Sequence, residues 1–183
     1  MGPIFDPDAE RKKRVRGMSE SNHNGHNAEV RLSDLYQEVI LDHNKRPRNF
    51  KKLEQATSFA HGVNPLCGDD YYVYLKRDPQ GMIQGVGFEG QGCAISKSSA
   101  SMMTMMVEGK NTQEAEKLKD AFIHLLTRDA VSAEERERAG KLKIFEGVRQ
   151  YPIRVKCATL AWRALEEALK ENTARQEKVT TEE

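Results

Sequence analysis

Three short strand patterns follow one another in the chain, and almost every pattern after them is helical. The segments SFAHGVN (58–64), YYVYLKR (71–77) and MIQGVGFEG (82–90) alternate in polarity or are rich in β-branched and aromatic residues. The turn DPQG (78–81), with Pro second and Gly fourth, joins the second segment to the third. Because the strands precede the helices instead of alternating with them, the sequence predicts an α+β fold built on an antiparallel meander of about three strands.

Apolar residues at helical spacing predict helices before and after these strands. The first helix is capped by Ser33, carries Leu35, Val39, Ile40 and His43 on its inner face, and stops before Pro47. A helix with several methionines, interpreted as core residues, follows Cys93 and ends near Gly109. Capping patterns at Asn111 and Ser132 begin two more helices, and 155–169 reads as the last one.

The ends of the chain lack such patterns. Residues 1–31 are rich in Gly, Pro, Asn and charge, so we expect a disordered tail; it contains a basic run at 11–16 and a second Met, Met18, that could be the true start. Residues 171–183 read as a polar C-terminal tail, which leaves one domain over 32–170. The formal net charge of +1 gives no general case for a nucleic-acid or membrane partner.

The three cysteines all stand near turns or helix starts. An odd number of cysteines without a secretory signal argues against disulfides and favours metal binding or thiol chemistry in the cytoplasm. Cys67 lies in the turn NPLCGDD, Cys93 ends a glycine-rich approach to a helix, and Cys157 is placed at the opening of the last helix. Free N–H groups at such positions favour the thiolate form, which is the form that binds metals.

We therefore hypothesise that Cys67, Asp69, Cys93 and Cys157 converge in the fold. Three thiolates and one carboxylate make a tetrahedral ligand set that suits Zn²⁺ or a small iron–sulfur cluster. The single oxygen ligand would be the most exchangeable of the four. Its displacement would open a coordination position to sulfur, iron or a partner's cysteine.

Several motifs of the chain resemble the SufU-type, NifU-like iron–sulfur cluster assembly proteins. The resemblance rests on NPLCGD (64–69), GFEGQGCAISKSSASMMT (87–104) and RVKCATLAW (154–162), and DLYQEVILDHNKRPRN (34–49) is similar to the family's first helix. It implies a three-stranded antiparallel sheet covered by helices and a metal site at Cys67, Asp69, Cys93 and Cys157. It also implies that Cys67 accepts persulfide sulfur from a SufS-like cysteine desulfurase, with zinc holding the site. The sulfur would then pass to downstream SUF components or to apo iron–sulfur proteins.

Two positions differ from the related IscU branch. Lys156 stands where that branch has a histidine, and YPIRVK (151–156) replaces its Pro-Pro-Val-Lys chaperone-docking segment. The charged segment from about 128 to 150 is similar to the insertion that marks the SufU branch. The resemblance therefore favours zinc-dependent sulfur transfer over the role of a scaffold served by a dedicated chaperone.

Three other functions remain open from the sequence. The same four residues could assemble a transient iron or [2Fe–2S] cluster and transfer it to apo-proteins. Cys93 could instead be the nucleophile of a cysteine hydrolase, for which only His43, His61 and His124 are candidate bases in the body of the chain. The chain could also be a binding module with an inert structural zinc.

Overall fold

The sheet of the protein contains the three predicted strands and one more. In the computed structural model, which describes residues 36–170 and 178–181, the strand order is β3–β2–β1–β4. The strands are β1 (Ser58–Asn64), β2 (Asp69–Arg77), β3 (Ile83–Gln91) and β4 (Lys178–Thr180). β1, β2 and β3 pair antiparallel, which confirms the predicted meander. β4 pairs in parallel with β1 and was not predicted.

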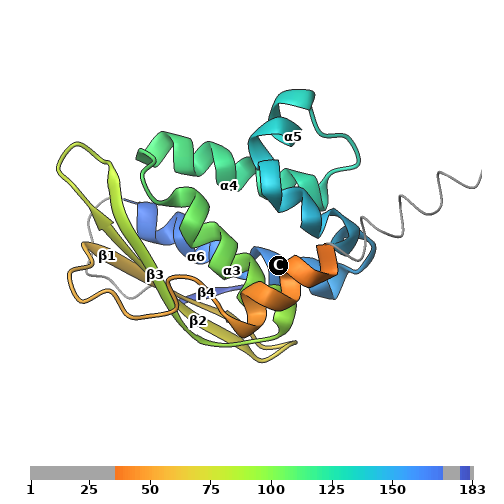
Figure 1. The fold of residues 1–183 in the computed structure, drawn as a ribbon, viewed down its shortest axis with the longest axis horizontal. Helices are drawn as coiled ribbons and strands as arrows, with labels where there is room; N and C mark the ends of the chain where they lie inside the picture. Colours follow the sequence, from red (N-terminus) through yellow and green to blue (C-terminus); the bar gives the residue numbers. More distant parts are fainter. Residues whose placement is uncertain (1–35, 171–177, 182–183) are drawn as a thin grey trace, which may run out of the picture. The chain divides into compact units, whose positions relative to one another are not determined.

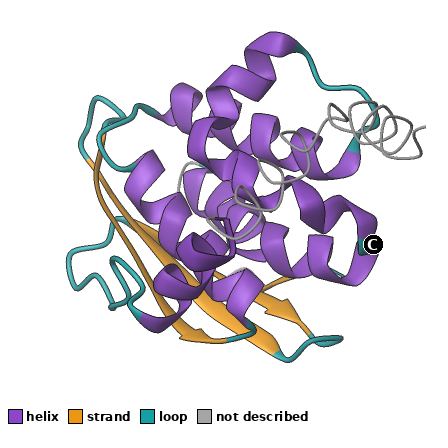
Figure 2. Ribbon diagram, turned by 45° about the vertical axis from the view of Figure 1, so that its right-hand side comes forward, coloured by secondary structure: helices purple, strands orange, loops and turns teal. Residues whose placement is uncertain are grey.

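The helices lie on one face of this sheet, with α3 and α6 packed directly against it (Figures 1 and 2). They are a helix over 36–45, α3 (Ala94–Val107), α4 (Thr112–Thr127), α5 (Ala133–Ala139), the 3-10 helix η1 (Gly140–Gln150) and α6 (Pro152–Leu169). The predicted α+β class is therefore confirmed. Asn111 and Ser132 each form a capping box, as their sequence patterns predict. The proposed cap Ser33 and the tail 1–31 lie outside the described residues.

Residues 140–150 form a helix that the sequence analysis did not predict. Leu142, Phe145 and Val148 are buried and recur every three residues, which is the period of a 3-10 helix rather than of an α-helix. The ring of Phe145 packs edge-on against Phe122 of α4, with 5.7 Å between the ring centroids. The segment similar to the SufU insertion is thus attached to the main core by its own apolar stripe.

The core lies between the sheet and the helices. Its largest fully buried side chains are Trp162, Tyr71, Phe88, Phe122 and Phe145. Met102 and Met103 belong to the same core, in agreement with the packing role assigned to the methionines. The core fixes α3 and α6 beside the ends of β1 and β2, where the cysteines lie.

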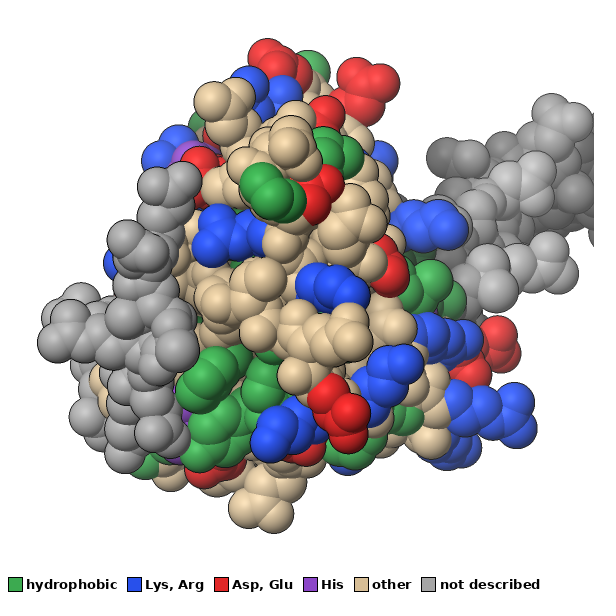
Figure 3. All heavy atoms as spheres, turned by 90° about the vertical axis from the view of Figure 1, so that its left-hand side faces the viewer, with side chains coloured by type: hydrophobic (Ala, Val, Ile, Leu, Met, Phe, Trp, Pro, Cys, Tyr) green, Lys and Arg blue, Asp and Glu red, His purple; other side chains and the backbone are tan. Residues whose placement is uncertain are grey.

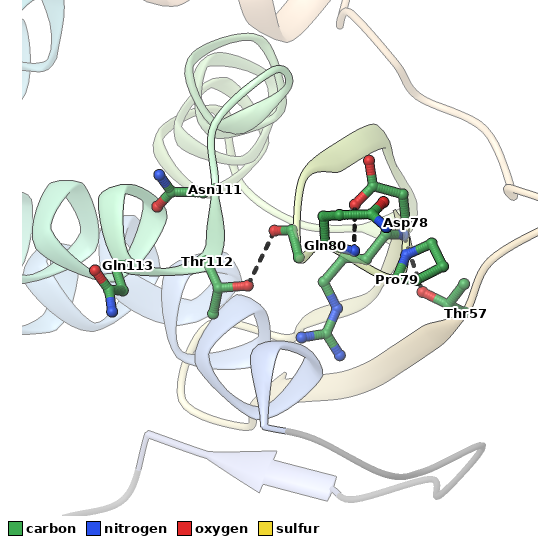
Figure 4. A pocket seen from close by; sticks show the side chains of 9 residues that line it. Thr57, Asp78, Pro79, Gln80, Asn111, Thr112 and Gln113 are labelled. Carbon is green, nitrogen blue, oxygen red and sulfur yellow. Dashed lines mark hydrogen bonds between the residues drawn. The ribbon is translucent and has the colours of Figure 1, made fainter.

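The predicted DPQG turn joins β2 to β3 and also fixes the start of α4. The carboxylate of Asp78 accepts hydrogen bonds from the N–H groups of Gln80 (3.0 Å) and Met82 (2.9 Å). The hydroxyl of Thr112, the first residue of α4, donates to the carbonyl of Gly81 at 3.2 Å (Figure 4). Asp78, Gln80, Gly81 and Thr112 are among the residues that line a cavity of about 850 Å³, and no described residue of its lining is a cysteine or histidine. It is therefore not the site that the sequence predicts.

Charge is mixed over the surface. Figure 3 shows one face on which lysine and arginine side chains are interspersed with aspartate and glutamate. The formal net charge of the whole chain is +1. Among the described residues, no helix is both long enough and apolar enough to cross a bilayer.

Candidate metal centre

Three segments that are distant in sequence bring their cysteines and an aspartate together. Cys67 comes from the turn between β1 and β2, Asp69 opens β2, and Cys157 lies in the second turn of α6. One ligand atom from each of these residues lies within 4.8 Å of the other two. No other group of three or more such residues is found in the part of the chain that the structure describes.

Cys93 approaches this group from the junction of β3 and α3. It is the N-cap of α3, and its Sγ accepts a hydrogen bond from the N–H of Ser96 at 3.4 Å. Its own N–H donates to Oδ1 of Asp69 at 2.8 Å. Cys93 is not part of the trio whose ligand atoms all lie within 4.8 Å, but its thiol interacts with that of Cys157. The structure therefore brings Cys67, Asp69 and Cys157 together and places Cys93 beside Asp69.

The thiols of Cys93 and Cys157 differ in acidity. A hydrogen bond from Cys157, helped by the N–H of Ser96, lowers the pKa of Cys93 to about 7. The bond to Cys93, followed by burial and by hydrogen bonds to Cys67 and Asp69, raises the pKa of Cys157. Cys93 is therefore the first of this pair to become a thiolate as the pH rises. It lies at the N-terminal end of α3, whose free N–H groups favour negative charge.

Asp69 and Asn64 form the buried floor of the site. They are paired across the end of the β1–β2 hairpin, and both are fully buried. Nδ2 of Asn64 donates to Oδ2 of Asp69 at 3.2 Å and to Sγ of Cys157 at 3.4 Å. The amide therefore orients the carboxylate and one thiol at once. The second oxygen of the carboxylate is held by the N–H of Cys93.

Two glycines allow β3 to pass close to this floor. A Cβ on Gly92 would lie 2.5 Å from the hydroxyl of Tyr71 and 2.7 Å from Oδ1 of Asp69. Gly90 has φ near +132°, and a Cβ there would lie 2.0 Å from the carbonyl oxygen of Asp70. Gly90 and Gly92 were expected to let the backbone approach a metal and a partner closely; in the structure they let β3 and the residue after it approach β2 and the aspartate itself.

The donor set fits a tetrahedral zinc site. With Zn–S bonds near ~2.3 Å, neighbouring ligand atoms of a tetrahedron stand roughly 3.8 Å apart, so a trio confined within 4.8 Å needs little rearrangement. Three sulfurs with one oxygen also suit iron in a small cluster. Asn64 and Ser96 add hydrogen bonds to two of the sulfurs, as outer partners of metal sites do.

Asn64 is the site residue that the sequence reasoning missed. It was interpreted only as the last residue of the strand SFAHGVN and the first of the turn NPLCGDD. The available signal is the period of β1, in which Ser58, Ala60, Gly62 and Asn64 are the buried positions. An amide at a buried strand position needs hydrogen-bond partners, and here they are two of the candidate ligands.

The candidate bases of the alternative cysteine hydrolase all have other partners. Nδ1 of His43 is hydrogen-bonded to the hydroxyl of Ser101 at 2.8 Å. His61 contacts Asp70 at 2.8 Å, and His124 contacts Glu135 at 2.6 Å. None of these contacts involves Cys93, so these three histidines, the ones within the described residues, form no base–nucleophile pair that would support the hydrolase hypothesis.

Comparison with known proteins agrees with this arrangement. The family described as the NifU-like N terminal domain matches residues 35–179. The chain belongs to this family. The match includes all four candidate ligands and most of the domain predicted over 32–170.

Individual members of the NifU-like family are similar over most of the chain. The iron–sulfur cluster assembly scaffold protein IscU of Streptococcus pyogenes serotype M1 is 39% identical over 140 residues, 76% of this chain and 86% of that protein. The zinc-dependent sulfurtransferase SufU of Bacillus subtilis (strain 168) is 36% identical over 138 residues, 75% of this chain and 91% of that protein. The crystal structure of FiSufU from Fervidobacterium islandicum AW-1 matches with a TM-score of 0.68 and 35% identity, over 73% of this chain and 95% of that one.

Proposed function

We propose that this member of the NifU-like family accepts sulfane sulfur from a SufS-like cysteine desulfurase at Cys67 and passes it on for iron–sulfur cluster assembly in the cytoplasm. The observation that carries the proposal is the group formed by Cys67, Asp69 and Cys157, whose ligand atoms lie within 4.8 Å of one another, with Cys93 bonded to Asp69 through its N–H. The names of the relatives, one a zinc-dependent sulfurtransferase and one a cluster assembly scaffold, agree with it.

The same four residues would hold a zinc ion. When bound, zinc supplies positive charge that keeps its cysteine ligands as thiolates at neutral pH. Asp69 would be the fourth ligand, oriented by the side chain of Asn64 and by the N–H of Cys93. Cys157, at 1% exposure, would be the fixed ligand inside the protein.

Position favours Cys67 as the sulfur acceptor. It lies in a surface turn beside Leu66, whose side chain is 63% exposed, while Cys157 is buried in α6. The Cys67 thiolate would attack the outer sulfur of the desulfurase persulfide. A new S–S bond forms at Cys67, the old S–S bond breaks, and the desulfurase cysteine leaves as a thiolate. The exchange needs no oxidant or reductant.

Mass mapping of the transferred sulfur tests this proposal. The zinc-loaded chain is incubated with a SufS-type cysteine desulfurase and cysteine, the thiols are blocked by alkylation, and the peptides are analysed. We expect one extra sulfur atom on the peptide that contains Cys67, and none when cysteine is omitted. Extra sulfur found only on the peptides of Cys93 or Cys157 would assign the acceptor role to another thiol.

The hydrogen bonds to the sulfurs favour cluster assembly as a second candidate function. Asn64 and the N–H of Ser96 each donate to a cysteine sulfur, and such bonds stabilise the ligands of iron–sulfur clusters. In this function the cluster is cargo that is built on the site and handed to an apo-protein. Visible absorption after incubation with iron and sulfide would support it, whereas a colourless protein that still accepts sulfur would support sulfur transfer alone.

We predict that Asn64→Ala weakens zinc binding about 10- to 100-fold, the usual cost of losing an outer partner of a metal ligand. The variant removes the side-chain amide that donates a hydrogen bond to the buried Oδ2 of Asp69. Competition with a zinc chelator measures the affinity. Asn111→Ala is the matched control: it removes the cap of α4, so it should lower stability but leave zinc affinity unchanged. Equal affinities in both variants would contradict the role of Asn64.

A further inference from the structure

A second site-like feature lies on another face of α6. A cavity of about 310 Å³ is bounded by the end of α4, the end of η1, one side of α6 and the end of β4. Its volume is at the lower end of the range for small-ligand pockets. None of the four candidate metal ligands lines it, so it is distinct from the metal centre.

The charged side chains of this cavity are all basic. Arg149, Lys156 and Arg163 line it, and no lining residue is acidic. Among the described residues, neither Lys156 nor Arg163 has a carboxylate partner. Within the described ranges the carboxylate partner of Arg149 is Asp129, which is fully exposed and 3.5 Å away, and such a pair contributes little energy in water. Three cations around one hollow repel each other unless an anion lies between them.

Two further features favour an anion in the same place. Thr181 is 5% exposed, and its buried hydroxyl oxygen has no hydrogen-bond partner in the part of the chain that the structure describes. Unpaired buried hydroxyls are uncommon because the loss of hydration is uncompensated. In addition, α6 begins at Pro152 with no side-chain cap and no acidic residue in its first turn, so neither its cap nor its first turn supplies an anionic side chain to its free N–H groups.

We propose that this cavity binds an oxyanion, either a phosphate group or a carboxylate, between Arg149, Lys156 and Arg163 with Thr181 as an additional donor. The guanidinium groups suit planar or tetrahedral oxyanions because each can donate two parallel hydrogen bonds. Leu126 and Val155 form an apolar part of the cavity wall. A short carbon chain attached to the charged group could pack against it. The source is a free phosphate compound or an acidic side chain of a bound protein.

Titration of the full-length, zinc-loaded chain followed by amide NMR tests the proposal. At constant ionic strength, inorganic phosphate should shift the signals of Thr159 and Thr181 in a saturable way, and chloride should not. Arg163→Gln should weaken phosphate binding about tenfold, as expected for a charge-assisted hydrogen bond. Arg163 is chosen because it is further along α6 from Cys157 than Lys156. Thr181→Val, which keeps the shape of the side chain, should weaken binding several-fold.

The controls separate this site from general surface charge. Lys117→Gln removes an exposed cation of α4 that does not line the cavity, and it should leave phosphate binding unchanged. Tighter binding of an acetylated Asp/Glu peptide than of phosphate would identify a protein as the source of the oxyanion; the reverse would identify a phosphate compound. Shifts that do not saturate, or that are equal in Arg163→Gln, would overturn the proposal. Binding that occurs only when Glu182 and Glu183 are both changed to Gln would also overturn it, because the chain's own acidic end would then be the occupant.

Discussion

The Cys67→Ser variant should accept no sulfur from a cysteine desulfurase, while the wild-type chain accepts one sulfur atom at this position. Serine has nearly the same size, but its hydroxyl is not ionised at neutral pH and cannot displace a thiolate from a persulfide. The measurement is sulfane sulfur bound per chain after a single turnover of the desulfurase. Because Cys67 lies in a turn and not in the core, the fold should survive the change.

Cys93→Ser is the matched control for this prediction. Both cysteines are half-buried and both are candidate ligands, so both variants should bind zinc more weakly than the wild type. Only Cys67→Ser also removes the proposed acceptor. We therefore expect Cys93→Ser to retain measurable sulfur uptake at Cys67. Uptake by Cys67→Ser at the wild-type level would show that the acceptor assignment is wrong, whatever the metal content of the two variants.

The local patterns of the chain were sufficient to predict the order of most elements. β1 spans the predicted residues, the DPQG turn forms where expected, and the caps of α4 and α5 are the predicted Asn111 and Ser132. Each of these features depends on neighbouring residues: alternation, a turn residue, or a side chain that reaches an N–H three positions on. Such signals survive in the fold because tertiary packing reinforces them.

The missed elements depend on contacts that a local pattern does not contain. β4 is only three residues long, and its strand geometry comes from pairing with the edge of β1, more than a hundred residues earlier. η1 has an apolar period of three, which matches neither the α-helix nor the strand template. In both cases the partner, not the segment's own propensity, selects the structure.

Two signals in the sequence, besides the predicted fold, led to the candidate site. The placement of the cysteines near turns and helix starts suggested convergence, and the family resemblance supplied the order of the ligands. One placement differs: Cys157 lies in the second turn of α6 rather than at its opening, so its burial, not a helix end, dominates its surroundings. The role of Asn64 was missed because it requires knowledge of which strand face meets α6.

Gly90→Ala should destabilise the protein by about 3 kcal/mol or more and abolish zinc binding. The backbone of Gly90 has φ near +132°, a region that costs a residue with a side chain roughly 1–3 kcal/mol. The new Cβ would also lie 2.0 Å from the carbonyl oxygen of Asp70, so β3 must move away from β2, at a further cost of about 1–3 kcal/mol. Because movement of β3 also displaces Cys93 from Asp69, we expect zinc binding to be lost together with stability.

Urea unfolding and bound zinc per chain, measured on the same samples, test both parts of this expectation. Gly147→Ala in η1 is the matched control, because a Cβ there would meet no atom within 4 Å. Its free energy of unfolding should stay within about 0.5 kcal/mol of the wild-type value, and its zinc content should not change. If Gly90→Ala matched Gly147→Ala in both measurements, the close approach of β3 to β2 would not be what positions Cys93. If Gly90→Ala lost stability but kept zinc, the ligands would be held by the elements that carry them rather than by the contact between Cys93 and Asp69.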